Sequence, residues 1–153
     1  PPMLHAYACT VLGAALGAKG GFWFQIGDGA IVLRTSAGTY SLATWPDNVD
    51  YPDVTHFVIE VDYKDYIKFG HLPAELDALA IMSDGLQLLA LDYAARAPHN
   101  AFFESPLTSL AKCQPGHATH FETQLADFLS EGRVNARTND DKTLVLACRP
   151  TLA

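Results

Sequence analysis

The sequence predicts an α+β fold in which a mostly antiparallel sheet system carries helices on its faces. Three observations predict it. Short apolar runs separated by glycine-containing turns fill the first half of the chain, helical periodicity occurs twice in the second half, and a further apolar run lies at residues 143–148. The 153 residues contain no internal repeat or low-complexity tract, so we expect one domain over residues 1–153.

The first 43 residues predict short strands joined by tight turns. The first strand is an apolar run in which Gly13, having no side chain, allows close packing against a neighbouring strand. Residues 19–21 (Lys-Gly-Gly) have the composition of a hairpin turn, and residues 27–29 (Gly-Asp-Gly) that of a sharp bend. We therefore expect a meander with strands at residues 8–18, 22–26, 30–34 and 39–43.

Residues 44–53 are rich in Pro, Asp and Asn, and this composition predicts a long surface loop. Strand character resumes at residues 55–62, where Phe57, Ile59 and Val61 alternate with their neighbours. Another strand is predicted at residues 76–82, where the apolar run stops at a Ser-Asp-Gly sequence. Both runs fit strands of an antiparallel sheet.

Two segments have the periodicity of helices. The first follows residues 84–85 and the second covers residues 119–131, with Gly132 in the position of a C-terminal cap. The apolar face of the first consists of Leu86, Leu89, Ala90 and Tyr93, and that of the second of Phe121, Leu125, Phe128 and Leu129.

Charge and cysteine content exclude several classes of protein. The formal net charge is -7 and the ten Lys and Arg residues form no run, which argues against a nucleic-acid-binding surface. Residues 8–18 resemble a signal-peptide core, but no Lys or Arg precedes them and they are too short to span a membrane. Cys9, Cys113 and Cys148 are an odd number at wide spacings, unlike a disulfide framework or a zinc pair. We expect a cytoplasmic protein that binds neither nucleic acid nor membrane.

Acidic residues stand at the ends of three predicted strands. Asp28-Gly29 and Asp84-Gly85 each follow a strand, and residues 139–141 (Asn-Asp-Asp) precede the last one. A rigid sheet can direct such carboxylates at a common point. Carboxylates without accompanying Cys or clustered His are hard oxygen ligands suited to magnesium, manganese or calcium. Taken alone, each Asp-Gly pair is typical of an ordinary turn.

These acidic segments and their neighbours resemble successive motifs of the metal-dependent protein serine/threonine phosphatases of type 2C, and of the bacterial subgroup in particular. The family's motifs are, in order, an apolar Thr-rich strand, a Gly-Asp-Ser or Gly-Asp-Gly strand end, a Ser-Asp-Gly before a helix, and Asp-Asn-x-Thr before the last strand. The matching segments here are residues 11–16, 25–29, 80–86 and 140–145. The resemblance covers nearly all of the chain and identifies it as the C-terminal portion of such a domain.

The resemblance implies a two-layer antiparallel β-sandwich flanked by helices, with a site for two or three Mn²⁺ or Mg²⁺ ions at one end. By position, Asp84 and Asp140 match metal-binding aspartates of the family. Asp28 matches the aspartate that helps to hold a third, weaker metal in bacterial members. The residues that stand beside these ligands are Gly29, Gly85 and Asp141.

Two of these neighbours differ from the commonest family pattern. Asp141 stands where many members have Asn, and Gly29 where many have Ser, although the bacterial subgroup resembles this chain in both. The implied activity is metal-dependent hydrolysis of phosphoserine and phosphothreonine, so a phosphorylated protein is the expected partner. In such an activity, bound metal ions would acidify a water molecule for attack on phosphorus, and no covalent intermediate would be required.

The family's first metal-binding aspartate lies in an early Asp-Gly motif, beside a histidine and downstream of an arginine in many members. No residues before the predicted strand at 8–18 supply these groups. We therefore expect N-terminal strands and a helix to be missing, the metal site to be partial and this chain alone to be inactive. Exposed sheet edges would then pair with a second copy or with an N-terminal fragment.

Three alternatives remain open. A phosphatase-like domain without metal chemistry would serve as a binding or regulatory module. His117 and His120, with Cys113 one helical turn earlier, have a spacing that could hold zinc, although lone helical histidines are commonly solvated surface groups. The long loop could bind calcium, but its acidic residues lack the glycine and final glutamate of a calcium loop: Asp47, Asp50 and Asp53.

Overall fold

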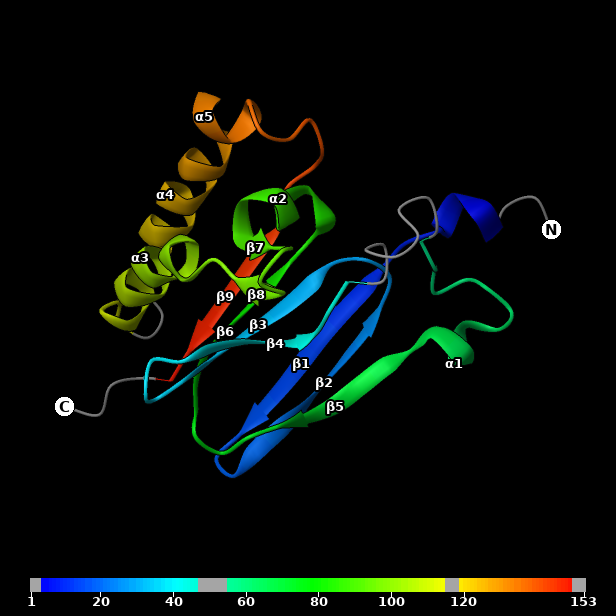
Figure 1. Ribbon diagram of the computed structural model, residues 1–153, viewed down its shortest axis with the longest axis horizontal. Coiled ribbons are helices and arrows are strands. Elements are labelled where there is room, and N and C mark those ends of the chain that lie inside the picture. Colours follow the sequence, from blue (N-terminus) through cyan, green and yellow to red (C-terminus); the bar gives the residue numbers. More distant parts are fainter. Residues whose placement is uncertain (1–3, 47–54, 115–118, 150–153) are drawn as a thin grey trace.

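The fold is built on a four-stranded antiparallel sheet with a second sheet on one face and helices on the other (Figure 1). The computed structural model describes residues 4–46, 55–114 and 119–149. In these residues the four-stranded sheet has the order β4-β3-β6-β9, the second sheet the order β1-β2-β5, and β7 pairs with β8. The strands are β1 (Val11–Gly17), β2 (Gly20–Ile26), β3 (Ala30–Thr35), β4 (Tyr40–Thr44), β5 (Lys68–Leu72), β6 (Leu76–Met82), β7 (Leu91–Asp92), β8 (Ala97–Pro98) and β9 (Leu144–Cys148). The helices are η1 (Leu4–Tyr7), α1 (Tyr63–Tyr66), η3 (Asp84–Leu86), α2 (Gln87–Ala90), α3 (Asn100–Ala111), α4 (Thr119–Ser130) and α5 (Gly132–Asn135).

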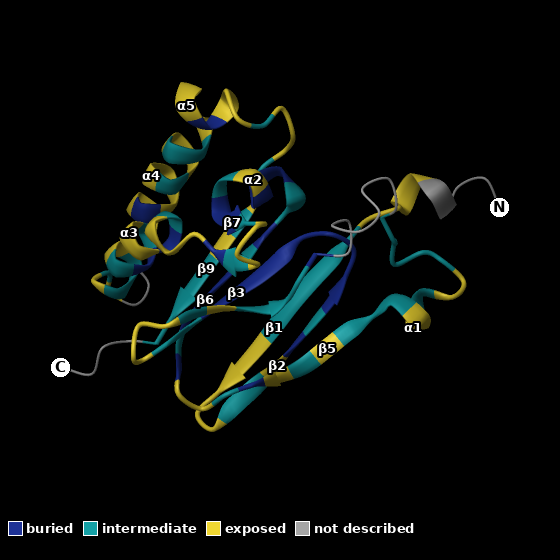
Figure 2. Cartoon of the chain, in the orientation of Figure 1, coloured by how far each residue is buried: buried dark blue, intermediate teal, exposed yellow. Residues whose placement is uncertain are grey.

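Side chains of the four-stranded sheet alternate between two hydrophobic cores. Ile31, Leu33 and Leu79 pack with Trp23 and Leu72 of the second sheet. The opposite face packs beneath α2, α3 and β7 through a cluster that includes Ala30, Val32, Ala78, Ala80, Met82, Leu86, Leu91, Phe103 and Leu107. Figure 2 shows β3 buried along most of its length, as expected for a strand covered on both faces.

The predicted α+β class with antiparallel sheets is confirmed. The predicted strands at 8–18, 22–26, 30–34, 39–43, 76–82 and 143–148 correspond to β1, β2, β3, β4, β6 and β9. The expected meander is wrong at its centre, because β2 and β3 lie in different sheets. Residues 27–29 carry the chain from one sheet to the other, so the first four strands contribute two to each layer.

The predicted strand at residues 55–62 is wrong, because this segment forms turns that lead into α1. Local polar contacts replace a sheet ladder there: the Glu60 carboxylate accepts a hydrogen bond from the Phe57 backbone N–H at 2.7 Å and lies 3.1 Å from His56 Nδ1. Strand β5, which was not predicted, pairs with β2 instead. It is short and has Gly70 at its centre, where an added Cβ would lie 2.8 Å from Nε1 of the Trp23 indole.

The helices differ in extent from the predicted ones. The helix expected after residue 85 consists of η3 and α2 and ends at Ala90, so Tyr93 lies beyond it. Helix α3 was not predicted, and it contains Pro106, a residue that normally ends a helix. Helix α4 is confirmed, but Gly132 begins α5 rather than capping α4. None of the helices in the described residues combines the length and apolar character needed to cross a bilayer.

The contact between Gly70 and Trp23 predicts a specific sensitivity of the sandwich core. Gly70→Ala should lower the free energy of unfolding by about 1–3 kcal/mol, because the new methyl group forces the Trp23 ring out of place. Gly132→Ala is the matched control: its added Cβ meets open space at the start of a helix, so stability should stay equal or rise by up to about 1 kcal/mol. Urea unfolding followed by tryptophan fluorescence measures both, and equal effects at the two positions would contradict this account of the core.

Candidate metal centre

The three acidic segments lie at one edge of the four-stranded sheet. In the antiparallel register, Ala30 of β3 pairs with Met82 of β6, and Met82 pairs with Leu144 of β9. The start of β3, the end of β6 and the start of β9 are therefore adjacent. Asp28 lies two residues before Ala30, and Asp84 lies two residues after Met82. Residues 140–141 come three to four residues before Leu144.

Hydrogen bonds join the turn after β6 to the loop before β9. The Ser83 hydroxyl donates a hydrogen bond to the Asp141 carbonyl at 3.2 Å and accepts one from the Thr143 N–H at 3.0 Å. The Ser83 N–H donates to the Thr143 carbonyl at 3.1 Å. An added Cβ at Gly85 would lie 2.3 Å from the Asp141 carbonyl oxygen and 3.3 Å from Asp140 Cβ. Glycine at position 85 therefore allows the two loops to meet.

Each of these loops uses one carboxylate oxygen for its own backbone. Asp84 Oδ1 accepts from the Gly85 N–H at 2.9 Å, and Asp140 Oδ1 accepts from the Asp141 N–H at 2.9 Å. These contacts orient the side chains. The second oxygen of each carboxylate has no hydrogen-bond partner among the residues that the structure describes, so it is available to a ligand.

The Asp28 loop is held mainly through its backbone. Gly27 has φ of 99°, a left-handed conformation suited to glycine. The buried Gln25 amide donates to the carbonyls of Gly27 at 2.9 Å and Gly29 at 2.7 Å, and the Gln87 amide donates to the carbonyl of Asp28. The Asp28 carboxylate is also buried.

One hydroxyl contacts that carboxylate directly. The Thr55 hydroxyl donates to Asp28 Oδ2 at 2.8 Å, which brings the segment before α1 against the site. Beyond Gln87, the Tyr93 hydroxyl donates to Gln87 Oε1 at 2.6 Å. The Asp28 loop is thus tied to two parts of the chain that are distant in sequence.

The charges of the neighbouring aspartates act on Asp84. Burial, followed by the charges of Asp28 and Asp140, raises the pKa of Asp84 above its ordinary value. Burial and the charges of Asp28 and Asp84 raise the pKa of Tyr93 in the same way. None of the three aspartates forms an ion pair with a residue that the structure describes. The site therefore concentrates negative charge that a cation would relieve.

The structure brings Asp28, Asp84 and Asp140 into electrostatic range and places Gly29, Gly85 and Asp141 beside them. In the described part of the chain, no group of three or more His, Cys, Asp and Glu side chains is arranged to hold a metal ion. The sequence pattern did not identify Thr55 or Gln87, and it placed Tyr93 only on an apolar helix face. Gln87 could have been noticed as a polar residue on an otherwise apolar helix, α2. The contact of Thr55 with Asp28 depends on the tertiary fold alone.

The alternative ion sites fall wholly or partly on residues outside the described ranges. Asp47, Asp50 and Asp53 all lie outside them, as does His117. Of the other two members of the suggested zinc group, Cys113 donates its thiol hydrogen to the Ser109 carbonyl at 3.4 Å, and His120 is exposed on α4.

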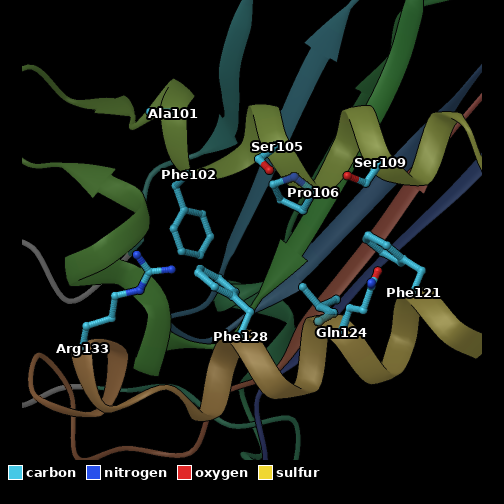
Figure 3. Close-up of a pocket in the computed structure, with 10 residues that line it drawn as sticks. Ala101, Phe102, Ser105, Pro106, Ser109, Phe121, Gln124, Phe128 and Arg133 are labelled. Carbon is cyan, nitrogen blue, oxygen red and sulfur yellow. The ribbon is translucent and has the colours of Figure 1, made fainter.

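Two hollows lie on the helical side of the molecule. One, of about 540 Å³, adjoins the candidate site and is lined by Leu88, Ala136, Arg137, Thr138, Asn139 and Asp140. The other, of about 330 Å³, lies between α3 and α4, where Phe102 and Phe128 face each other and Arg133 lies at one end (Figure 3). Only the first includes one of the three aspartates.

The chain is similar to known proteins. A family model described as protein phosphatase 2C matches residues 3–130, a range that includes Asp28 and Asp84 and stops before Asp140. The chain is 34% identical over 141 residues to serine/threonine-protein phosphatase 3 of Escherichia coli (strain K12). That alignment covers 92% of this chain and 55% of the relative, so the chain spans about half the length of the curated relative it matches. No solved structure gives a significant match. The resemblance seen in the motifs is confirmed, and the chain belongs to the protein phosphatase 2C family.

Proposed function

We propose that this chain forms part of a metal-dependent phosphatase that removes phosphate from phosphoserine and phosphothreonine on protein substrates. The observation that carries the proposal is the grouping of Asp28, Asp84 and Asp140, which have no ion-pair partner in the described residues, at one sheet edge. A family match that includes two of them supports it, as does a relative named as a serine/threonine-protein phosphatase. Repelling carboxylates have no evident structural use, whereas a divalent cation gives them one.

The donors present fit Mn²⁺ or Mg²⁺. Asp84 and Asp140 each offer a free carboxylate oxygen and would act as ligands, with Asp28 as an auxiliary ligand. When bound, such ions acidify water and neutralise charge on a phosphoryl group. The chain's own residues supply negative charge and fix its position: Ser83 joins the Asp84 and Asp140 loops, and Gln25 and Gln87 hold the Asp28 backbone.

We further propose that the site is completed by a segment outside this chain, giving two or three ions in the intact domain. The chain spans 55% of its bacterial relative, which leaves sequence for the remaining ligands. Residues 1–153 would then be one part of a single domain. On this proposal the chain alone is inactive.

The outer face of the β1-β2-β5 sheet is the proposed contact for that segment or for a second copy. Phe22 is 53% exposed and Phe69 is 76% exposed, and the register of β1, β2 and β5 places both on the face opposite to Trp23. Among the described residues no helix covers this face (Figure 2). Large apolar side chains grouped on one sheet face favour a partner there.

We also propose the cytoplasm as the compartment. Cys9, Cys113 and Cys148 are all free thiols in the structure, which suits a reducing environment.

The raised pKa of Asp84 predicts a pH-dependent stability of the metal-free chain. A carboxyl whose folded pKa is raised loses stability as pH rises from its ordinary value of 3.8 through the raised value, and the loss persists above it. Asp84→Asn should therefore stabilise the metal-free protein at neutral pH, by roughly 0.5 kcal/mol for a partly exposed group. The gain should vanish in acid below the ordinary pKa. Thermal unfolding in EDTA across this pH range measures it.

Asp127→Asn is the matched control, because it removes the same charge from the exposed face of α4. It should leave the pH dependence of stability unchanged. Salt should shrink the effect at position 84 by screening the neighbouring aspartates. A neutral-pH loss of stability in the metal-free Asp84→Asn protein would show that these carboxylates do not repel one another.

The proposed activity requires both metal ligands and the completing segment. With manganese and the N-terminal segment supplied from the parent reading frame, the chain should hydrolyse para-nitrophenyl phosphate, and EDTA should abolish turnover. Asp84→Asn and Asp140→Asn should each lower kcat/KM by at least about 100-fold, because each removes a ligand and a charge. Asp28→Asn should have a smaller effect. Turnover by the chain unaided, or full activity of Asp84→Asn, would refute the proposal.

A further inference from the structure

The hollow of about 540 Å³ beside Asp140 has a chemistry that the proposed hydrolysis does not use. It lies where α5 ends and the chain turns toward β9, and Asp140 belongs both to its wall and to the candidate metal centre. A protein substrate whose phosphorylated residue reaches the metal centre must place neighbouring residues over adjoining surface. The side chains of this hollow would therefore contact residues that flank the phosphorylated residue and influence which substrates bind.

Arg137 is the positive charge of the hollow, and it is exposed and unengaged. Its guanidinium has no hydrogen bond or ion pair with any residue that the structure describes. The neighbouring Lys142, by contrast, donates to Asn135 Oδ1 at 2.9 Å. Elsewhere Arg34 binds Asp77 at 2.7 Å, and Arg149 binds the Leu76 carbonyl at 2.6 Å. Arg137 is thus free to bind an external anion.

The rest of the lining adds donors and one apolar surface. Thr138 Oγ1 accepts from the Asp140 N–H at 3.2 Å, which leaves its hydroxyl hydrogen free to be donated. The Asn139 side-chain amide has no partner in the described residues. Leu88, 66% exposed, forms an apolar wall. With Asp140 neutralised by a cation, the hollow presents a net positive charge and three kinds of hydrogen-bond donor, the pattern that recognises an oxyanion.

We propose that this hollow is a substrate subsite that binds an anionic side chain flanking the phosphorylated residue, with Arg137 as its specificity-determining residue. This inference rests on the proposed function. The shared chemistry of the ligand is an oxyanion, supplied either by a Glu or Asp carboxylate or by a second phosphate. An arginine fork matches both groups, and a charge-assisted hydrogen bond is stronger than a neutral one.

The test compares peptides that differ only beside a non-hydrolysable phosphonate analogue of phosphoserine. Flanking positions carry Ala, Glu or phosphoserine in three otherwise identical peptides. NMR titration of the ¹⁵N-labelled chain, with magnesium and the N-terminal segment supplied, gives each Kd. Wild type should bind the anionic peptides about fivefold more tightly than the Ala peptide, a factor typical of one exposed charge-assisted contact. Amide shifts should centre on Leu88 and residues 137–140. The stronger of the two anionic peptides identifies the carboxylate or the phosphate as the preferred source.

In Arg137→Ala the ratio of anionic to Ala-peptide affinity should fall to about one, and Arg137→Lys should retain part of it. The matched control is Arg133→Ala, an exposed arginine of the other hollow, which should keep the wild-type ratio. The dispersion of the same NMR spectra shows that each variant is folded. A wild-type ratio near one, or an unchanged ratio in Arg137→Ala, would overturn the subsite.

Failure of the subsite can be told apart from failure of the proposed function. Para-nitrophenyl phosphate has no flanking residues, so its hydrolysis by the completed wild-type enzyme tests the metal chemistry alone. Hydrolysis together with a wild-type peptide ratio near one rejects the subsite and leaves the phosphatase. Absence of hydrolysis rejects the phosphatase and, with it, the assignment of this hollow to a substrate.

Discussion

Burial of the four-stranded sheet on both faces is the constraint on which the candidate site depends. Ile31 and Leu33 pack toward the second sheet, while Ala30 and Val32 pack beneath the helices. A slip of one residue along β3 would exchange these two sets, and each would then face a core shaped for the other. The strand ends are fixed as a result, and so are the loops that carry the aspartates. The site inherits its position from apolar packing some distance away.

The loops that carry the aspartates are held by neutral hydrogen bonds, and no ion pair in the described residues involves their carboxylates. Ser83 connects two loops through a backbone carbonyl and a backbone N–H, and Gln25 and Gln87 bind backbone carbonyls around Asp28. Neutral hydrogen bonds of this kind fix geometry without cancelling negative charge. A salt bridge from a basic side chain to one of these aspartates would stabilise the metal-free protein more. It would also occupy carboxylate oxygens that a metal ion could bind. The arrangement keeps carboxylates unpaired at a cost in stability.

The sequence predicted those features that depend on interactions between residues close together in the chain. Strands such as β3 and β6 were predictable because their apolar runs are bounded by local turn signals, and the aspartates at strand ends were predictable for the same reason. The predictions failed where hydrogen bonds or tertiary packing outweighed the local sequence pattern. Residues 55–62 alternate like a strand, yet Glu60 satisfies the backbone locally, and α3 tolerates Pro106 because tertiary packing buries Phe103 and Leu107.

Partners within the site were the least predictable part. The hydroxyl of Thr55 reaches Asp28 from 27 residues away, and nothing in its own neighbourhood marks it. Gln87 differs, since an amide buried beside apolar residues needs a partner, and its partner is a carbonyl 59 residues away. Spacing predicts which residues share an edge, whereas side-chain partners depend on how the layers are packed.

The close approach of the Asp141 carbonyl to Gly85 has a consequence for how this loop tolerates mutation. The loop makes this contact through the backbone of residue 141, and the Asp141 side chain is exposed. Substitution at position 141 is therefore expected to be tolerated as long as the carbonyl stays in place. Position 85 has no such freedom, because any side chain would occupy the space of that carbonyl. Two residues in contact are thus expected to tolerate substitution to very different degrees.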